Sequence, residues 1–130
     1  MTKKEIVTAY SVALGSGDIP KAFSFFSEDV KWHQPGNNIF SGIKHGAAEI
    51  GEALGKMMEV TDGTLAISPA GDLMESGNLV AVPVCFSAKS GQKKMEMNGT
   101  DVYEVVDGKI VNVWLFSESQ DDEDAFWGNS

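Results

Sequence analysis

One segment of the chain places a single ionisable side chain among apolar ones. Residues 93–106 alternate as a β-strand does, with successive side chains on opposite faces. One face is mostly polar and carries Lys94, Glu96, Asn98, Thr100, Val102 and Glu104. The other face is mostly apolar and carries Met95, Met97, Gly99, Asp101, Tyr103 and Val105. Asp101 is therefore the one charged residue that this strand would turn toward a core.

A carboxyl group in that position is suited to acid or base chemistry. Burying it costs free energy unless the group is paired, hydrogen-bonded or protonated. Loss of solvent would raise the pKa of Asp101, and a neighbouring cation would lower it. A general acid or base needs such tuning, so Asp101 is the first catalytic candidate. The sequence also leaves open a structural aspartate tied to backbone amides, or a bulge at Gly99 that exposes the side chain.

His33 is the second candidate, because an imidazole exchanges a proton near neutral pH. In the strand expected at residues 29–34, Trp32 faces one way, and His33 and Lys31 face the other. That pattern by itself favours a surface or loop-packing histidine. The other histidine, His45, is expected in a loop, and we assign no role to it.

The chain offers few metal ligands. Two histidines and one cysteine are too few for the usual zinc sites. The acidic run at residues 121–124 lacks the alternating spacing of a calcium loop. Acids that open a short helix, where the helix dipole favours negative charge, are the better interpretation. The sequence predicts no metal site, and it shows no phosphate-binding glycine loop or recognisable Ser-His-Asp set.

Helices come first along the chain and strands follow. Thr2 and Glu5 have the spacing of a capping box, which predicts a helix that ends near Gly15. Asp18 is expected to cap a second helix whose apolar stripe is Ile19, Ala22, Phe23 and Phe26. We predict a third helix at 46–58, strands at 29–34, around Leu65 and Ile67, and at 79–88, 93–106 and 110–117, and a hairpin turn at 107–108. This order is typical of an α+β domain with helices on one face of an antiparallel sheet.

Pro83 interrupts the apolar strand predicted at residues 79–88. Because proline has no backbone N–H to donate, we expect it at a sheet edge or a bulge.

Size and composition fit a single domain over residues 1–130. The chain is 42% hydrophobic, which is enough for a core, and its net charge of -9 repels nucleic acid and anionic membranes. Its one cysteine, Cys85, cannot form a disulfide within the chain. The N-terminus lacks the apolar core of a signal peptide. We expect a cytoplasmic protein that binds neither nucleic acid nor a membrane.

Three separated motifs resemble a known family over nearly the whole chain. The first is residues 29–36 (DVKWHQPG), followed by Ser41-Gly42 and Gly46. The second is residues 101–110 (DVYEVVDGKI) with Trp114, and the third is residues 124–127 (DAFW). Together they resemble the SnoaL-like branch of the nuclear-transport-factor-two-like superfamily.

The resemblance implies a cystatin-like or ketosteroid isomerase-like fold, in which a curved antiparallel sheet wraps as a cone around N-terminal helices. Relatives include polyketide cyclases, ketosteroid isomerases, limonene epoxide hydrolases and dehydratases. They typically need no cofactor and often form homodimers through the sheet. The resemblance places Asp101 inside the cone and gives His33 a position on the cavity wall. Leu115 stands where some catalytic relatives carry an acid, so cyclase-type aldol chemistry is not implied.

These observations lead to an expected function. We expect a cofactor-independent enzyme of isomerase, lyase/cyclase or hydrolase type, which acts on a small, mostly apolar oxygenated molecule in an interior pocket. Asp101 and His33 are the expected catalytic residues. The residues expected to bind substrate are Tyr10, Trp32, Leu54, Met58, Phe86, Met97, Tyr103, Val113 and Leu115. The alternatives are a non-catalytic binder of small molecules and a dimeric protein-interaction module.

Overall fold

The computed structural model describes residues 1–128, which form four helices and seven strands. The helices are α1 (Lys3–Gly15), α2 (Ile19–Phe23), α3 (Gly46–Val60) and α4 (Gln120–Trp127). The strands are β1 (Phe26–Gln34), β2 (Gly42–His45), β3 (Ala66–Pro69), β4 (Met74–Ser76), β5 (Leu79–Ser90), β6 (Lys93–Val106) and β7 (Lys109–Ser117).

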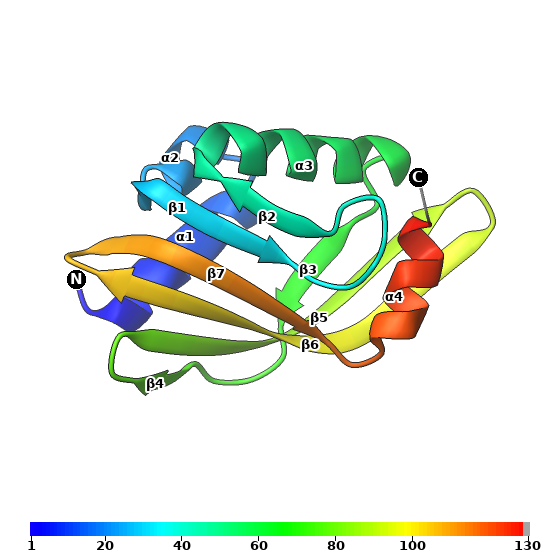
Figure 1. Ribbon diagram of the computed structural model, residues 1–130. Helices are drawn as coiled ribbons and strands as arrows, with labels where there is room; N and C mark the ends of the chain where they lie inside the picture. Colours follow the sequence, from blue (N-terminus) through cyan, green and yellow to red (C-terminus); the bar gives the residue numbers. More distant parts are fainter. Residues whose placement is uncertain (129–130) are drawn as a thin grey trace.

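The strands form one curved sheet in the order β2-β1-β7-β6-β5-β3, with β4 also paired to β5. All neighbours are antiparallel except β1 and β7, which run parallel. Helices α1 and α3 lie against one side of the sheet, and α4 lies by the far end of β5 and β6 (Figure 1). The predicted α+β fold, a curved sheet around N-terminal helices, is confirmed.

The capping box predicted for the first helix is present. The Glu5 backbone N–H donates to the Thr2 hydroxyl at 3.1 Å, and the Thr2 N–H donates to the Glu5 carboxylate at 2.8 Å. These bonds satisfy amides that have no partner within the helix. The helix then buries its inner face, which includes Tyr10.

The second helix is shorter than the apolar stripe predicts. Asp18 caps it as expected, by accepting from the Lys21 N–H at 3.2 Å. The helix ends at Phe23, however, and Phe26 is the first residue of β1, where it pairs with Ile110. Both environments bury an aromatic ring, so apolar spacing alone could not tell them apart.

The sheet also contains strands that the pattern did not predict. β2 and β4 have only four and three residues, too few for a clear alternation. His45, expected in a loop, ends β2, and its N–H donates to Glu49 at 2.8 Å as α3 begins. Ile67 lies in β3 as expected but is 53% exposed.

Pro83 lies in a central strand and yet avoids losing a partner there. On one side of β5, pairing with β3 stops at Val84 and pairing with β4 starts at Ala81. Pro83 falls in the gap between them, where its carbonyl accepts from the Ala70 N–H at 2.9 Å. The position is a break in the pairing, and neither the outer edge nor the bulge that we expected.

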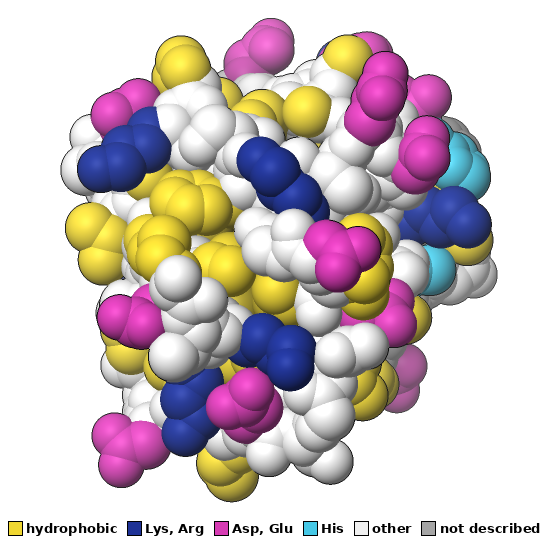
Figure 2. Space-filling view, turned by 90° about the vertical axis from the view of Figure 1, so that its left-hand side faces the viewer, with side chains coloured by type: hydrophobic (Ala, Val, Ile, Leu, Met, Phe, Trp, Pro, Cys, Tyr) yellow, Lys and Arg dark blue, Asp and Glu magenta, His cyan; other side chains and the backbone are white. Residues whose placement is uncertain are grey.

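Two hydrophobic clusters fill the space inside the sheet. The larger joins α1 and the middle of the sheet and includes Tyr10, Val82 and Tyr103. The smaller joins α3, β5, β6 and α4 and includes Met97 and Trp127. On the face shown in Figure 2, lysines lie among acidic side chains, and some hydrophobic side chains gather between them. None of the helices within residues 1–128 is long and apolar enough to span a membrane.

Gly99 allows the closest approach in the sheet. A Cβ atom there would lie 2.5 Å from the Phe116 carbonyl oxygen and 2.9 Å from the Phe86 ring. Gly99→Ala should therefore lower the free energy of unfolding by about 1–3 kcal/mol, measured by urea denaturation.

The matched control for this prediction is Gly55→Ala. Gly55 lies inside α3 and has nothing within 4 Å of an added Cβ. That change should stabilise the protein by about 0.5–1 kcal/mol. Equal effects of the two substitutions would contradict the close packing at Gly99.

Candidate functional site

Asp101 lies on the inner face of the sheet. It pairs with Val82 of β5 and Leu115 of β7. Val82 is buried, and so is Val113, which shares a face of β7 with Leu115. The register of β6 with both neighbours is unbroken from residue 99 to residue 104. There is thus no bulge at Gly99, and the alternation keeps the carboxyl group pointing inward.

The surroundings of Asp101 change its acidity. Burial is the main cause that raises the pKa of Asp101 to about 7, and the negative charge of Glu123 is the second cause. The side chain nevertheless keeps partial contact with solvent. We call this mostly apolar place on the inner face, where some solvent still reaches the Asp101 carboxyl group, the recess. Phe86 and Leu115, on the same inner face, are also only partly buried.

Two tyrosines lie beside this carboxyl group. Tyr10 of α1 and Tyr103 of β6 meet edge to face, with ring centroids 5.7 Å apart. Burial is the main cause that raises the pKa of each phenol, and the charge of Asp101 adds to it. Both hydroxyl groups therefore stay protonated and can donate hydrogen bonds. The Tyr103 hydroxyl bonds to Ser11, whereas the buried Tyr10 hydroxyl has no partner within residues 1–128.

A buried polar group without a partner is unusual and costs about 1–3 kcal/mol. Tyr10, which was expected to bind substrate, is the residue that carries this unpaired hydroxyl.

Helix α4 brings a second carboxyl group into the interior, which the sequence reasoning missed. Glu123 is 5% exposed. Its carboxylate accepts from the Ser117 hydroxyl at 2.6 Å, the Gln120 amide at 3.0 Å and the Trp127 indole at 3.2 Å. Within residues 120–127 the acids open the helix as predicted, but only Glu123 is buried among them. Its spacing of three and four residues from the aromatic pair Phe126 and Trp127 was the available signal.

Gln34 is another interior polar group that was missed. It is buried and accepts a hydrogen bond from the Trp32 indole at 2.9 Å. It shares the inner face of β1 with Val30 and Trp32, so the alternation that pointed to Asp101 could have revealed it as well.

His33 does not share the recess with Asp101. It pairs with Trp114, whose ring stacks on it at 5.1 Å between centroids, and its Nε2 is 3.0 Å from the Asn112 amide oxygen. These residues occupy the outer face, because the inner face of β7 carries Val113. The cavity position implied by the family resemblance is wrong for His33, and the surface position indicated by the alternation is right.

Most residues expected to bind substrate do lie on the inner side. Eight of them face inward and are buried or partly buried: Tyr10, Trp32, Leu54, Phe86, Met97, Tyr103, Val113 and Leu115. Met58 is the exception, at 43% exposed. The buried face of α3 runs through Ile50, Leu54 and Met57, and Met58 is turned by about 100° from Met57 along the helix.

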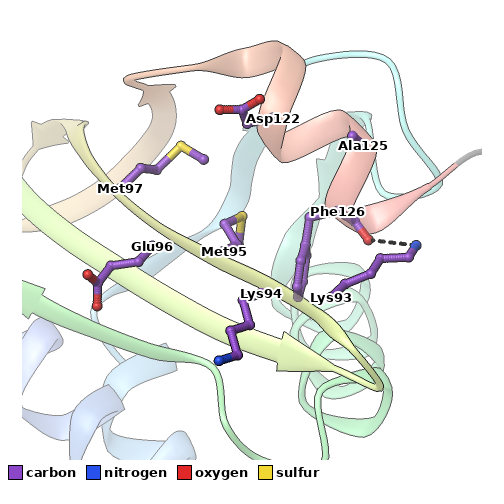
Figure 3. Close-up of a pocket in the computed structure, with 8 residues that line it drawn as sticks. All are labelled: Lys93, Lys94, Met95, Glu96, Met97, Asp122, Ala125 and Phe126. Atoms are coloured by element: carbon purple, nitrogen blue, oxygen red, sulfur yellow. Dashed lines mark hydrogen bonds between the residues drawn. The ribbon is translucent and has the colours of Figure 1, made fainter.

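A cleft of about 380 Å³ opens between α4 and β6. Figure 3 shows Met95 and Met97 pointing toward α4, while Lys94 and Glu96 point the other way. Asp101 does not line this cleft, but it follows Met97 by four residues on the same face of β6. No group of three or more side chains able to hold a metal ion occurs within the part of the chain that the structure describes.

Comparison with known proteins identifies the family. The sequence pattern of the SnoaL-like domain matches residues 7–113. The chain belongs to the SnoaL-like family. A crystal structure of a protein of unknown function with a cystatin-like fold, from Xanthomonas campestris, is 47% identical to this SnoaL-like domain. Its TM-score is 0.93, and the match covers 99% of this chain and 100% of that chain.

Less similar structures share the fold alone. An NTF2-like protein from Burkholderia xenovorans is 19% identical, with a TM-score of 0.81 over 97% of this chain and 95% of that chain. TerC, crystallised with polyporic acid, is 22% identical, with a TM-score of 0.79 over 90% of this chain and 92% of that chain. The comparison with curated proteins found no match to this chain.

The raised pKa of Asp101 makes stability depend on pH. An unfolded aspartate ionises near pH 4, whereas Asp101 in the fold holds its proton up to about pH 7. The stabilising contribution is full below the unfolded pKa and is lost as pH rises through the folded pKa. The unsubstituted protein should therefore lose a few kcal/mol of its free energy of unfolding between pH 4 and pH 7. Asp101→Asn should not show this loss.

The measurement is urea denaturation of both proteins at pH 4.5 and pH 8. Asp101→Asn should be more stable than the unsubstituted protein at pH 8, because the amide need not ionise in the recess. A stability difference that is the same at both pH values would contradict the raised pKa of Asp101.

Proposed function

We propose that this SnoaL-like domain is a cofactor-independent enzyme that transfers a proton within a small, mostly apolar, oxygenated substrate. The observation that carries the proposal is the Asp101 carboxyl group, which lies in an apolar recess and has a pKa of about 7. A group with this pKa both accepts and donates a proton at neutral pH, as general acid-base catalysis requires. The isomerase, lyase/cyclase and hydrolase types of reaction all use such a step.

The arrangement of Asp101 and Tyr10 supports a simple reaction. Ionised Asp101 would take a proton from a carbon next to a carbonyl group, and the electron pair left behind would move onto the carbonyl oxygen. The free hydroxyl of Tyr10 would donate a hydrogen bond to that oxygen. Protonated Asp101 would then return the proton to another carbon. Ketosteroid isomerase likewise depends on carboxyl groups whose protonation is set by their environment.

The inner face indicates the class of substrate. Around Asp101 it offers aromatic and aliphatic side chains, among them Phe86 and Leu115, and few charges. Such a surface suits a small apolar molecule with one or two oxygen atoms. TerC, which has the same fold, has been crystallised with polyporic acid. We assign no catalytic role to His33, and Tyr10 takes the part of hydrogen-bond donor.

We also propose that two copies pair through the outer face of the sheet. Phe116 is 58% exposed on this face, two residues from the Trp114 ring that stacks on His33. An exposed aromatic side chain next to a partly exposed one favours a protein partner. The net charge of -9, with lysines set among acidic side chains (Figure 2), makes nucleic acid and anionic membranes poor partners.

The dimer predicts a specific effect of one substitution. Phe116→Asp should convert a dimer into a monomer, because it buries a charge in the apolar contact. Light scattering after size-exclusion chromatography gives the mass of each. Val12→Asp, at an exposed position on α1, should leave the mass unchanged. An unsubstituted protein that is already a monomer would contradict the proposal.

The catalytic proposal is tested by hydrogen exchange on small ketones. A panel of cyclohexenones and tetralones is incubated with the protein in D₂O, and exchange of the hydrogens next to the carbonyl is followed by NMR. We expect the protein to accelerate exchange of at least one ketone, and Asp101→Asn to lose about 100-fold or more of that acceleration. The rate should rise with pH through about 7, as Asp101 ionises.

Glu96→Gln is the matched control, since Glu96 is an exposed acid on the opposite face of the same strand. It should keep the full rate. If Asp101→Asn also kept the rate, Asp101 would not be the base. If the ketones bound equally to both proteins without exchange, a non-catalytic binding protein would be the better description.

A further inference from the structure

The interior holds two carboxyl groups from distant parts of the chain, and only one has been given a part in the reaction. Asp101 comes from β6, and Glu123 comes from α4, the helix by the far end of β5 and β6 (Figure 1). Buried acids are rare unless they are paired or hydrogen-bonded. The presence of Glu123 near a candidate acid-base group therefore needs a reason.

The sheet register brings Glu123 close to Asp101. Ser117 of β7 pairs with Gly99, and Leu115 pairs with Asp101, so Ser117 and Asp101 are diagonal neighbours on the inner face. The Ser117 hydroxyl donates to Glu123 Oε1 at 2.6 Å. This bond fixes the Glu123 carboxylate within one side chain of the recess.

The hydrogen bonds of Glu123 suit a carboxylate ion. Ser117 and Gln120 donate to Oε1, and Trp127 donates to Oε2. Three donors converge on the group, and its charge is thereby stabilised although it is buried. Asp101, in contrast, has no such set of donors within residues 1–128, and the charged group that acts on it there is Glu123.

Two carboxyl groups that share a small apolar space do not ionise independently. A negative charge on Glu123 favours the protonated form of Asp101. The remaining ionisable groups that face Asp101 are Tyr10 from α1 and Tyr103 from its own strand, and both stay neutral. The residues opposite Asp101 on β5 and β7, Val82 and Leu115, carry no charge.

We propose that Glu123 is a positioning residue, whose carboxylate is held beside Asp101 by Ser117, Gln120 and Trp127 and so makes the acid-base group depend on the docking of α4. The docking is itself specific. Asp124 accepts from the Asn37 backbone N–H at 3.1 Å and the Asn38 amide at 2.8 Å, which ties α4 to the loop after β1. If α4 were displaced, the pKa of Asp101 would be lower, because the charge of Glu123 would no longer act on it.

This inference rests on the proposed function, because it describes how the same acid-base group is tuned. The test is carbon-13 NMR titration of the Asp101 side chain, which needs no substrate. Glu123→Gln keeps the size of the side chain and removes its charge. The proton affinity of Asp101 should fall by about tenfold, at the low end of the effect of a neighbouring charge. The midpoint of the ketone exchange rate should move to lower pH with it.

Two further variants separate charge from packing. Ser117→Ala removes a hydrogen bond from Glu123 but keeps the charge, so Asp101 should not become more acidic. Asp122→Asn removes an exposed charge from the same turn of α4. The proton affinity of Asp101 in this variant should differ from that in the unsubstituted protein by less than about twofold. Near-ultraviolet circular dichroism, to which Trp127 contributes, checks that each variant keeps the packing of the unsubstituted protein.

The outcomes distinguish this inference from the proposed function. If Asp101 in the unsubstituted protein titrates near 7 but does not respond to Glu123→Gln, Glu123 is not a positioning residue and the proposed function stands. The same conclusion follows if Ser117→Ala or Asp122→Asn shifts Asp101 as far as Glu123→Gln does. If Asp101 responds to Glu123→Gln, yet Asp101→Asn keeps the exchange rate, the electrostatic coupling stands and the catalytic assignment fails.

Discussion

The desolvation of one carboxyl group is the constraint on which the site depends. Asp101 cannot turn away from the interior, because β6 is held on both sides. Its pairing with β5 is continuous over the full length of the contact, and its pairing with β7 is continuous from Gly99 to Glu104. A strand fixed in this way alternates strictly, and a one-residue slip would turn Tyr103 and Val105 outward as well. The packing of the core thus holds the carboxyl group in its recess.

The same constraint explains the polar groups around it. A carboxyl group with few hydrogen bonds, a tyrosine hydroxyl with none and a buried glutamate are all costly in a core. A fold selected for stability alone would replace them with apolar side chains. Tyr10 and Asp101 both lie by Tyr103, and Glu123 enters the same interior from α4. Local violations of packing rules of this kind are typical of functional sites.

Local sequence signals predicted much of the fold. The alternation in β6, the capping box at Thr2 and the hairpin turn between β6 and β7 each rest on neighbours in the chain, so they could be read without the structure. The orientation of Asp101 followed from the same alternation. His33 shows the limit of analogy, since the alternation in its own strand indicated the outer face and the family resemblance did not.

The features that the sequence did not predict depend on contacts between segments that are distant in the chain. Glu123 looked like one acid in a run of four, and only the docking of α4 against β7 turns it inward. Phe26 fits either a helix or a strand until its partner Ile110 is known. The missing partner of the Tyr10 hydroxyl is likewise a property of the packed interior, because any of several strands could have offered an acceptor. The family is established by sequence, whereas the chemistry has to come from this arrangement.

The central claim is that the interior of this SnoaL-like domain holds a carboxyl group that exchanges its proton near neutral pH. The most direct measurement is the carbon-13 chemical shift of the Asp101 carboxyl carbon in the unsubstituted protein, followed from pH 3 to pH 9. Our account predicts a single midpoint near 7, well above the ordinary value of about 4 for aspartate. A midpoint at the ordinary value would mean that Asp101 is solvated or paired, and would contradict the account.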